Sequence, residues 1–324
     1  MVASEKVLVT GAAGHVGGRT CRALTLSANL TVRAAHRSMP EPRAWAERNE
    51  VVVGDIADPR HRTEMLDRVG RVVHLATRGY SAAQPPTSRQ LDEDRTSTIA
   101  LASDAASRGV RRFVYVSSLH VYGQALAGAV NEGTPPRPDT PYGESRWAIE
   151  GELAEIGESS GMEVAVVRMS NAFGVPEYDR TAAWSLLIHD LCRQACHHGG
   201  LRLRSNGRAY RNVIALRDAV EVLVRIVEAD VTVAGTYLLA GPETLTVREI
   251  ATMVADEAFA VFGAAPTVEV DDSDMARYEP FHLEPENLRA LGIAPTDHRR
   301  AEIRDLLHYA HDDPKARIGR PGAQ

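Results

Sequence analysis

The chain has 324 residues, of which 44% are hydrophobic, and a formal net charge of −6. Such a chain can bury a large core in about two domains, or in one domain with a smaller lobe, and its negative charge argues against nucleic acid as a partner. No apolar run approaches the roughly 18 residues of a membrane-spanning helix, no signal-peptide pattern opens the chain, and three cysteines cannot form a disulfide framework, so we expect a cytoplasmic protein with no membrane partner.

The N-terminal stretch predicts a strand, a glycine-rich turn and a helix in direct succession. Residues 7–10 predict a buried parallel strand, and a helical pattern runs over 16–28. The turn between them contains Gly11, Gly14 and Gly17. Because glycine carries no Cβ, a pyrophosphate can approach this backbone and meet free N–H groups at the helix N-terminus. An ordinary strand-to-helix turn is the alternative, but three glycines at this spacing after an apolar strand favour a dinucleotide site.

Strands and helices alternate through the first half of the chain. Further strands are predicted at 30–35, 50–53, 71–75, 113–117 and 163–168, and helices at 58–70, 90–108 and 142–160. This alternation is typical of the α/β class and predicts a doubly wound parallel sheet, the Rossmann arrangement. Its ligands should bind at the carboxyl ends of the strands. Glycine and proline residues over 123–140 predict a surface loop above the substrate, or only a connector.

The second half predicts a smaller C-terminal substrate lobe. Thr246 and Glu249 form a capping box for a helix that ends near Phe262. Other helices are expected at 182–197, 216–228 and 288–292, a short strand at 201–203, and another strand of the main sheet at 235–240. We expect a dinucleotide-binding domain over 1–174, to which 207–240 returns, a substrate lobe over 175–206 and 241–309, and a disordered tail over 310–324.

The end of the second strand bears on the choice of dinucleotide. An acidic residue there would bind the adenosine ribose 2′-hydroxyl of NAD and repel the 2′-phosphate of NADP. This sequence has His36, Arg37 and Ser38 at that place, and a guanidinium with a hydroxyl suits a phosphate. We therefore expect NADP, with NAD as the alternative if Arg37 is only a solvated loop residue. At the end of the third strand, the carboxylate of Asp55 could accept the adenine amino group.

One histidine and cysteine pattern invites a metal interpretation. His189, Cys192 and Cys196 fall on one face of a predicted helix. Paired cysteines of structural zinc sites are usually two to four residues apart in a turn, whereas these lie within a continuous helix. We therefore expect a packed core stripe and no metal.

Several ordered motifs follow the predicted strands. They are the glycine turn, Gly54-Asp55, His74-Leu75-Ala76, Val116-Ser117-Ser118, Val121-Tyr122-Gly123 and the segment from Pro141 to Arg146, with Glu150 after it. With these motifs the chain, from about residue 5 to about 309, resembles the extended short-chain dehydrogenase/reductase family. The resemblance is to its nucleotide-sugar-modifying branch, the NAD-dependent epimerases, dehydratases and 4-ketoreductases.

The resemblance implies that Tyr142 is the acid/base, which exchanges a proton with a substrate hydroxyl or carbonyl beside the nicotinamide. A free phenol has a pKa of about 10 and needs a nearby positive charge to act at neutral pH. The family places a lysine four residues later on the same helix face, where this sequence has Arg146. Arginine keeps the charge but cannot give up its proton. We expect Arg146 to position the ribose and polarise Tyr142, with the proton passing through water or His120.

A second departure bears on the reaction. Dehydratases of the family carry an Asp-Glu pair directly after the catalytic serine or threonine, where this sequence has Leu119 and His120. Elimination of water would then lack its acid and base. The resemblance therefore implies 4-keto reduction or C4 epimerisation of a nucleotide-activated sugar by hydride transfer. A catalytically impaired dinucleotide-binding sensor or scaffold is the alternative, because of Arg146.

The remaining assignments follow the family's motifs residue by residue. Catalysis is assigned to Tyr142, Arg146 and Ser118, which would hydrogen-bond the reacting oxygen. The substrate is expected at Ser118, His120, Asn171 and Arg211, although Asn171 could serve only to turn the chain and Arg211 could be an exposed strand residue. A homodimer formed by the helices at 90–108 and 142–160 is expected by resemblance. Cofactor binding is assigned to Gly11, Ala13, Gly14, His15, Val16, Gly17, His36, Arg37, Ser38, Asp55, Ile56, Leu75, Ala76, Thr77, Ser117, Tyr142, Arg146 and Ser170.

Overall fold

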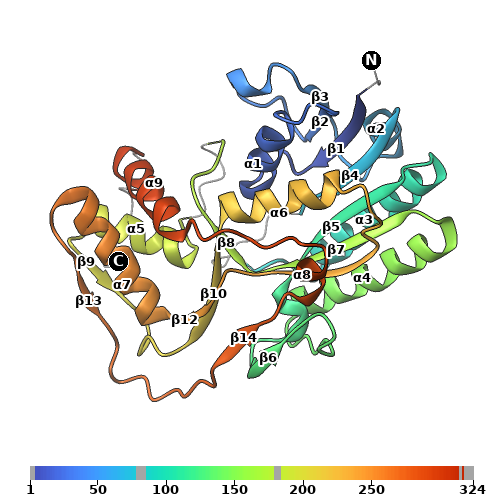
Figure 1. Cartoon of the computed structure of the whole chain (residues 1–324). Helices are drawn as coiled ribbons and strands as arrows, with labels where there is room; N and C mark the ends of the chain where they lie inside the picture. Colours follow the sequence, from blue (N-terminus) through green and yellow to red (C-terminus); the bar gives the residue numbers. More distant parts are fainter. Residues whose placement is uncertain (1–3, 78–84, 179–183, 314–315, 317–324) are drawn as a thin grey trace.

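A seven-stranded parallel sheet forms the centre of the protein in a computed structural model that describes residues 4–77, 85–178, 184–313 and 316 (Figure 1). The strand order is β11-β7-β5-β4-β1-β2-β3. This confirms the predicted α/β doubly wound sheet, including the late strand that returns to it. The strands are β1 (Glu5–Thr10), β2 (Leu30–His36), β3 (Glu50–Val53), β4 (Val69–His74), β5 (Arg112–Ser118), β7 (Glu163–Met169) and β11 (Gly235–Leu239).

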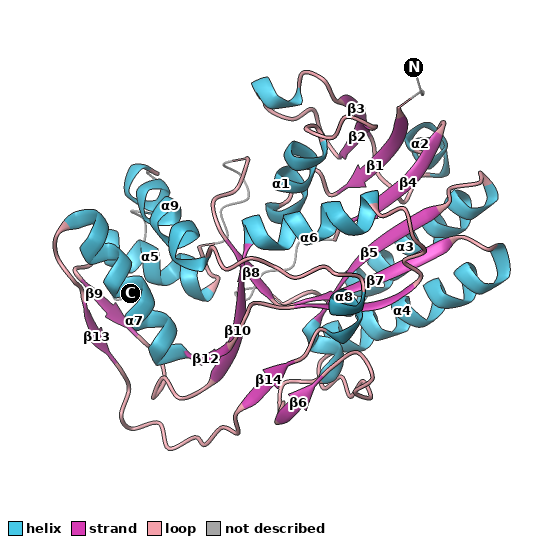
Figure 2. Ribbon diagram, viewed as in Figure 1, coloured by secondary structure: helices cyan, strands magenta, loops and turns pink. Residues whose placement is uncertain are grey.

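Helices cover both faces of the sheet (Figure 2). Consecutive strand residues point to opposite faces, so Val7 and Val9 enter one buried cluster and Leu8 enters the other. This explains why the strands are hydrophobic at nearly every position rather than at alternate ones. One face carries α1 (His15–Leu24) and α6 (Leu216–Glu228), and the other carries α2 (Pro59–Met65), α3 (Ser88–Ser107) and α4 (Pro141–Ser160).

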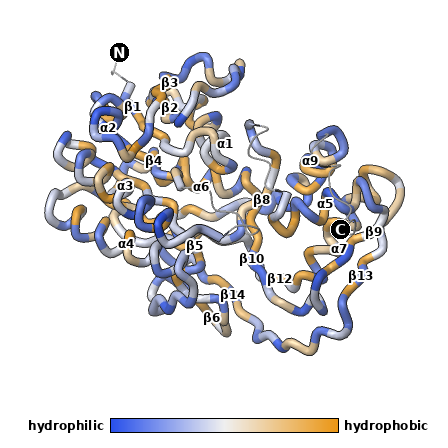
Figure 3. The backbone as a smooth tube through the Cα atoms, turned by 180° about the vertical axis from the view of Figure 1, so that it is seen from behind, coloured by the Kyte–Doolittle hydropathy of each residue, from blue (hydrophilic) through white to orange (hydrophobic). Residues whose placement is uncertain are grey.

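A second hydrophobic core lies in the C-terminal part of the chain. Its helices are α5 (Leu187–His197), α7 (Val247–Phe262) and α9 (Arg299–Asp312). Figure 3 shows hydrophobic positions recurring between hydrophilic ones along these helices, as expected when one face of each helix is buried. The capping box of Thr246 and Glu249 is present at the start of α7.

The remaining short strands form three small sheets outside the central one. The pairs are β9 (Gly200–Arg202) with β13 (Thr267–Glu269), β6 (Gly128–Val130) with β14 (Phe281–Leu283), and β10 (Tyr210–Ala215) with both β8 (Asn171–Phe173) and β12 (Thr244–Thr246). The segment predicted as a loop therefore contains β6, which pairs with a strand far away in the sequence. The remaining short helices are η1 (Ala44–Ala46), η2 (Leu119–Tyr122) and α8 (Glu286–Ala290).

Some predicted boundaries were wrong. Arg68 has a left-handed φ of 55°, which ends the helical region early, and β4 begins at Val69 instead of 71. Helix α9 runs to Asp312 with Ala310 fully buried, so the tail predicted from 310 begins inside a helix. The start predicted for the helix at 182 lies outside the described residues. Among the described helices, none is long and apolar enough to cross a membrane.

Helix α1 is attached to the C-terminal lobe as well as to the sheet. A guanidinium nitrogen of Arg19 donates to both carboxylate oxygens of Glu302 in α9 at 3.1 Å, and Glu302 also accepts the backbone N–H of Val175. Nearby, the rings of His15 and His189 meet edge to face with centroids 5.1 Å apart. The start of α1 is thus held between the two parts of the molecule.

Candidate active site

The glycine turn leaves an open helix N-terminus at the carboxyl edge of the sheet. Gly11 has a φ of 68°, and a Cβ there would lie 2.7 Å from the backbone nitrogen of Ala76. A Cβ on Gly17 would lie 2.0 Å from the Gly11 carbonyl oxygen. Helix α1 begins after Gly14 with no side-chain cap and no acidic residue in its first turn. The N–H groups of the exposed turn around Ala13 and of Val16 can therefore receive an anion.

The end of β4 is held against this turn by a buried histidine. The Nδ1 of His74 lies 2.7 Å from the hydroxyl of Thr10, and its Nε2 lies 2.9 Å from the hydroxyl of Thr98 in α3. The Thr10 hydroxyl also accepts the backbone N–H groups of Leu75 and Ala76 at 3.3 Å. Burial lowers the pKa of His74 to about 3, so the ring is neutral. Exposed Thr77 follows.

The end of β2 is partly covered by the segment that follows β8. His36 is buried, and its ring meets Tyr178 edge to face with centroids 6.1 Å apart. Burial lowers the pKa of His36. Arg37 and Ser38 are exposed at this edge. Only these two of the three predicted residues therefore present polar groups to solvent.

The end of β3 is held by an arginine that sequence reasoning missed. Arg62 donates to the carbonyl oxygens of Ile56 and Ala57 at 2.9 and 3.1 Å and pairs with Asp104 at 2.6 Å. A carboxylate oxygen of Asp55 accepts the Ala57 N–H at 2.9 Å. The segment that was expected at the adenine is thus fixed in place before any ligand binds.

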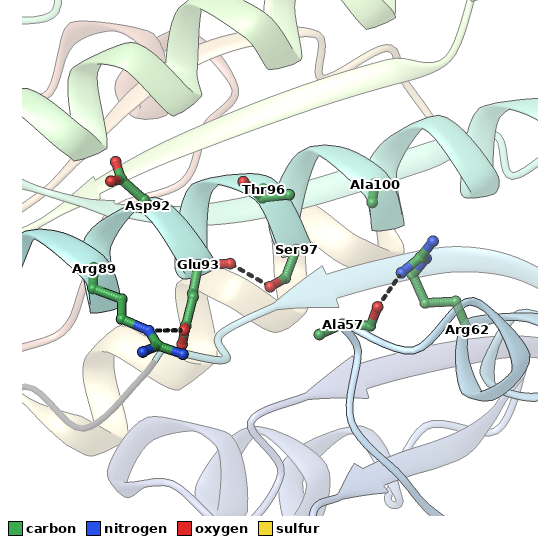
Figure 4. A pocket seen from close by; sticks show the side chains of 8 residues that line it. All are labelled: Ala57, Arg62, Arg89, Asp92, Glu93, Thr96, Ser97 and Ala100. Atoms are coloured by element: carbon green, nitrogen blue, oxygen red, sulfur yellow. Dashed lines mark hydrogen bonds and ion pairs between the residues drawn. The ribbon is translucent and has the colours of Figure 1, made fainter.

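A cavity of about 590 Å³ lies beside this segment, between it and the first half of α3 (Figure 4). Ala57 and Arg62 form one wall, and α3 supplies Thr96, Ser97 and Ala100 together with a surface pair of Arg89 and Glu93. Its polar lining was not predicted, because the contact between the loop and α3 is not visible in either segment alone.

Helix α4 brings Tyr142 to the end of β5. Thr140 caps the helix by accepting the Gly143 N–H at 3.1 Å, and Pro141 occupies its first turn. A Cβ on Gly143 would lie 2.5 Å from the carbonyl oxygen of His120. The start of α4 therefore packs directly on η2, and the rings of Tyr142 and His120 meet edge to face with centroids 5.5 Å apart.

Arg146 is buried beneath Tyr142. It is 2% exposed, and its guanidinium carbon lies 4.8 Å from the centroid of the Tyr142 ring. One terminal nitrogen donates to the Tyr115 hydroxyl at 2.8 Å, and the other lies 3.5 Å from a carboxylate oxygen of Asp94 in α3. Burial opposes the charge, but attraction by Tyr115, Tyr142 and Asp94 outweighs it and raises the pKa of Arg146. Burial raises the pKa of Tyr115 to about 12.

The two partners of Arg146 were not among the predicted site residues. Asp94 is a buried acid on the helix predicted at 90–108, and Thr98 follows it one turn later on the same face. Two polar residues at that spacing, with a tyrosine in a buried strand, were the available signal. Without a partner such as Arg146, burying the Asp94 carboxylate or the Tyr115 hydroxyl would have been costly.

Ser118 and Ser117 have different surroundings although they are adjacent. The Ser118 hydroxyl lies 2.8 Å from Nδ1 of His120 and accepts the His120 N–H at 3.3 Å. The Ser117 hydroxyl instead donates to Glu150, whose other oxygen accepts Arg168 at 2.7 Å. The Ser118 hydroxyl therefore contacts the histidine whose ring packs against Tyr142, whereas the side chain of Ser117 belongs to a buried network with Glu150 and Arg168.

A cavity of about 410 Å³ opens next to His120. Three of the predicted substrate residues, His120, Asn171 and Arg211, line it. Its lining also includes residues that were not predicted, among them Tyr210, Arg277, Tyr278 and Glu279. The Asn171 amide donates to the carbonyl oxygen of Asn212, and Arg211 donates to that of Tyr210. Both side chains keep exposed surface toward the cavity region.

Two buried polar groups at the carboxyl edge of the sheet have no hydrogen-bond partner among the described residues. They are the Ser170 hydroxyl and both ring nitrogens of His15, and burial lowers the pKa of His15 to about 3. Unpaired buried polar atoms are costly and usually indicate a missing partner. Together with the space that the glycines leave free, they fit a bound dinucleotide.

The histidine and cysteine pattern in α5 forms core contacts. Nε2 of His189 bonds the Gly174 carbonyl oxygen at 3.0 Å, Cys192 is fully buried, and the Cys196 thiol donates to Leu307 at 3.4 Å. Within the described ranges, no three His, Cys, Asp or Glu side chains are grouped so that they could hold a metal ion.

Comparison with known proteins agrees with this architecture. The Streptomyces griseus dTDP-glucose 4,6-dehydratase is 30% identical over 315 residues, which cover 89% of each chain. The Azospirillum brasilense UDP-glucose 4-epimerase is 30% identical over 203 residues, 60% of this chain and 57% of that one. The chain thus spans little more than half the length of some curated relatives.

Solved structures share the fold. A UDP-N-acetylglucosamine 4-epimerase from Methanobrevibacter ruminantium M1, in complex with UDP-N-acetylmuramic acid, superposes with a TM-score of 0.81 at 17% identity over 95% of this chain and 98% of its own. A UDP-glucuronic acid 4-epimerase from Bacillus cereus, in complex with NAD, gives 0.76 at 18% identity over 96% and 98%. The model of the NAD dependent epimerase/dehydratase family matches residues 7–240. The chain therefore belongs to the NAD-dependent epimerase/dehydratase family.

Proposed function

We propose that this protein reduces a 4-keto group, or inverts C4, of a nucleotide-activated sugar, with Tyr142 as the acid/base. The observation that carries the proposal is the position of the Tyr142 ring. Its centroid lies 4.8 Å from the guanidinium carbon of buried Arg146 and 5.5 Å from the ring centroid of His120. A phenol beside a fixed positive charge, next to a histidine that lines a cavity, is suited to general acid and base work.

The dinucleotide would lie along the carboxyl edge of the sheet. When bound, its nicotinamide ring supplies or accepts the hydride. The backbone of the glycine turn would hold the pyrophosphate, the segment around Asp55 the adenine, and the segment around Ala76 the middle of the molecule. The free hydroxyl of Ser170 and the polar cavity beside Ala57 support this path.

The role proposed for Arg146 is electrostatic. Its guanidinium is charged at every relevant pH, and Tyr115 and Asp94 hold it under the Tyr142 ring. A negative charge that develops on the phenol oxygen is stabilised by this cation at no reorganisation cost. Because arginine does not release its proton, Arg146 itself moves none.

The sugar nucleotide would occupy the 410 Å³ cavity. Arg211 and Arg277 provide positive charge for a diphosphate, and the aromatic side chains of Tyr210 and Tyr278 provide flat apolar surface for a base. The names of similar structures include UDP-glucuronic acid and UDP-N-acetylmuramic acid as ligands, which supports a nucleotide sugar as the substrate class here.

We propose NADP as the preferred dinucleotide and a homodimer as the assembly. Arg37 and Ser38 are exposed at the end of β2, and no acidic side chain replaces them. Similar structures hold NAD, so NAD is the cofactor to compare. Helices α3 and α4 pack on each other and present long outer faces, which supports the expected dimer.

The test is turnover of a panel of nucleotide 4-keto sugars and nucleotide hexoses with NADPH, NADH and their oxidised forms. We expect turnover in the native protein and a loss of about 10²–10⁴-fold in Tyr142→Phe. Tyr237→Phe, in the sheet core, is the matched control and should keep the rate. Dinucleotide binding without turnover, unaffected by Tyr142→Phe, would instead support the sensor or scaffold alternative.

A further inference from the structure

The proposed reaction needs a path for one proton between Tyr142 and solvent. The position beneath Tyr142 offers none, because Arg146 is 2% exposed and its terminal nitrogens are engaged by Tyr115 and Asp94. Its guanidinium also keeps its proton. The described lysine, Lys6, pairs with Glu50 at 2.9 Å in the sheet and does not reach this site. The proton must therefore leave by a route that does not pass through Arg146.

The ring of His120 also contacts Tyr142. Its Nδ1 lies 2.8 Å from the Ser118 hydroxyl, and its ring edge packs against the Tyr142 ring. The same side chain lines the 410 Å³ cavity. His120 thus touches the serine at one ring nitrogen and is also one of the residues that line the cavity. Among the described residues, His120 is thus an ionisable side chain that joins the serine to the cavity.

The surroundings of His120 keep its ring able to carry a proton in either direction. Tyr142 faces it from α4, Ser118 from β5, Asp139 from the segment before α4, and Arg211 from β10. Burial and the charge of Arg211 lower the pKa of His120, against the opposite effect of Asp139. At neutral pH the ring is therefore neutral, with one nitrogen that donates and one that accepts.

We propose that His120, acting through Ser118, is the residue that returns a proton to Tyr142 from solvent. The inference rests on the proposed function. In the reductive direction, hydride forms the C–H bond and the Tyr142 O–H proton passes to the carbonyl oxygen. The phenolate takes the Ser118 proton, Ser118 takes the Nδ1 proton of His120, and Nε2 takes one from water, after which the ring returns to its starting tautomer. The oxidative direction reverses each transfer, so one solvent proton is consumed or released per hydride moved.

Turnover of two His120 variants tests the relay. His120→Gln can still hydrogen-bond Ser118 but cannot pass a proton, so kcat should fall by about 10²-fold while KM for the sugar nucleotide and the dinucleotide Kd stay within threefold. The kcat of His120→Ala should fall by a similar factor and should recover when free imidazole is added. His308→Ala, an exposed histidine on α9, is the matched control and should show neither effect.

A second measurement does not depend on turnover. Nitrogen NMR of labelled protein reports which ring nitrogen of His120 carries the proton. We expect the Nδ1–H tautomer in the native protein, because Nδ1 must donate to Ser118, and a shift toward Nε2–H in Ser118→Ala. An unchanged tautomer in that variant would overturn the relay.

The outcomes separate the two proposals. A native protein that turns over, with His120→Gln equal to it or His120→Ala insensitive to imidazole, would overturn the relay and leave the proposed function standing. A native protein with no turnover on the panel would overturn both.

Discussion

At the residue scale, Arg146 stands where the family has a lysine, and it forms a buried polar group with Tyr115 and Asp94. Arg146 is bonded to Tyr115 at 2.8 Å and lies 3.5 Å from Asp94. Sequence reasoning identified the substitution and its effect on charge and proton release. It did not identify the partners, because they come from β5 and α3 and meet Arg146 only in the folded chain.

This group predicts an order of activity for substitutions at 146. Arg146→Lys keeps the charge but is too compact to hold both partners, so kcat/KM should fall by no more than about 10-fold, whereas Arg146→Gln should lose about 10²-fold or more. Steady-state kinetics with Arg289→Gln as a surface control distinguishes the two. Equal losses in both variants would show that geometry, and not charge, is what Arg146 contributes.

At the scale of elements, the start of α4 is the feature that assembles the site. The helical pattern over 142–160 made this helix predictable from the sequence, and the structure adds the Thr140 cap. Its contact with η2 was not predictable, since η2 is a single turn with no periodic pattern. The pairing of β6 with β14 was missed for a related reason: the partners are about 150 residues apart, so neither strand carries a local signal for the other.

The contact between α4 and η2 predicts the effect of adding one methyl group. In Gly143→Ala the new Cβ would lie 2.5 Å from the His120 carbonyl oxygen, so the helix must shift away. We expect a loss of about 1–3 kcal/mol in unfolding free energy and a fall in kcat larger than the change in dinucleotide Kd. Gly151→Ala, a position on the same helix with open space, should be neutral or slightly stabilising in urea unfolding. If both variants behave alike, the contact does not position Tyr142.

At the scale of the whole molecule, the sheet and the second core meet at α1. The alternation of strands and helices predicted the sheet, and the late return of the chain to β11 was foreseen. The link through Arg19, Glu302 and the two histidines was not, because a buried charge or imidazole is recognisable only when its partner in the other lobe is known. His15 was predicted to bind the cofactor and His189 to belong to a core stripe. Only the fold brings the two rings together.

Three buried neutral histidines predict that acid destabilises the protein. Burial lowers the pKa of His15 and His74 to about 3 and that of His189 to about 4, from a usual 6.5. The unfolded chain therefore binds more protons than the folded one below about pH 6.5, and stability that is complete above that pH is lost as the pH falls toward 4. Urea unfolding from pH 7.5 to 4.5 should show this decline. His15→Phe should make it shallower, and an unchanged slope would contradict the assignment.

The central claim is that Tyr142 moves a proton while hydride passes between a nicotinamide ring and the sugar. The most direct measurement is mass spectrometry of the sugar nucleotide after incubation with a dinucleotide that carries deuterium at the transferable position of its ring. We predict that the native protein transfers the label to the sugar ring and that Tyr142→Phe, with unchanged dinucleotide binding, does so at a rate lower by about 10²-fold or more. Equal transfer by both proteins, or tight dinucleotide binding with no label transferred by the native protein, would contradict the account.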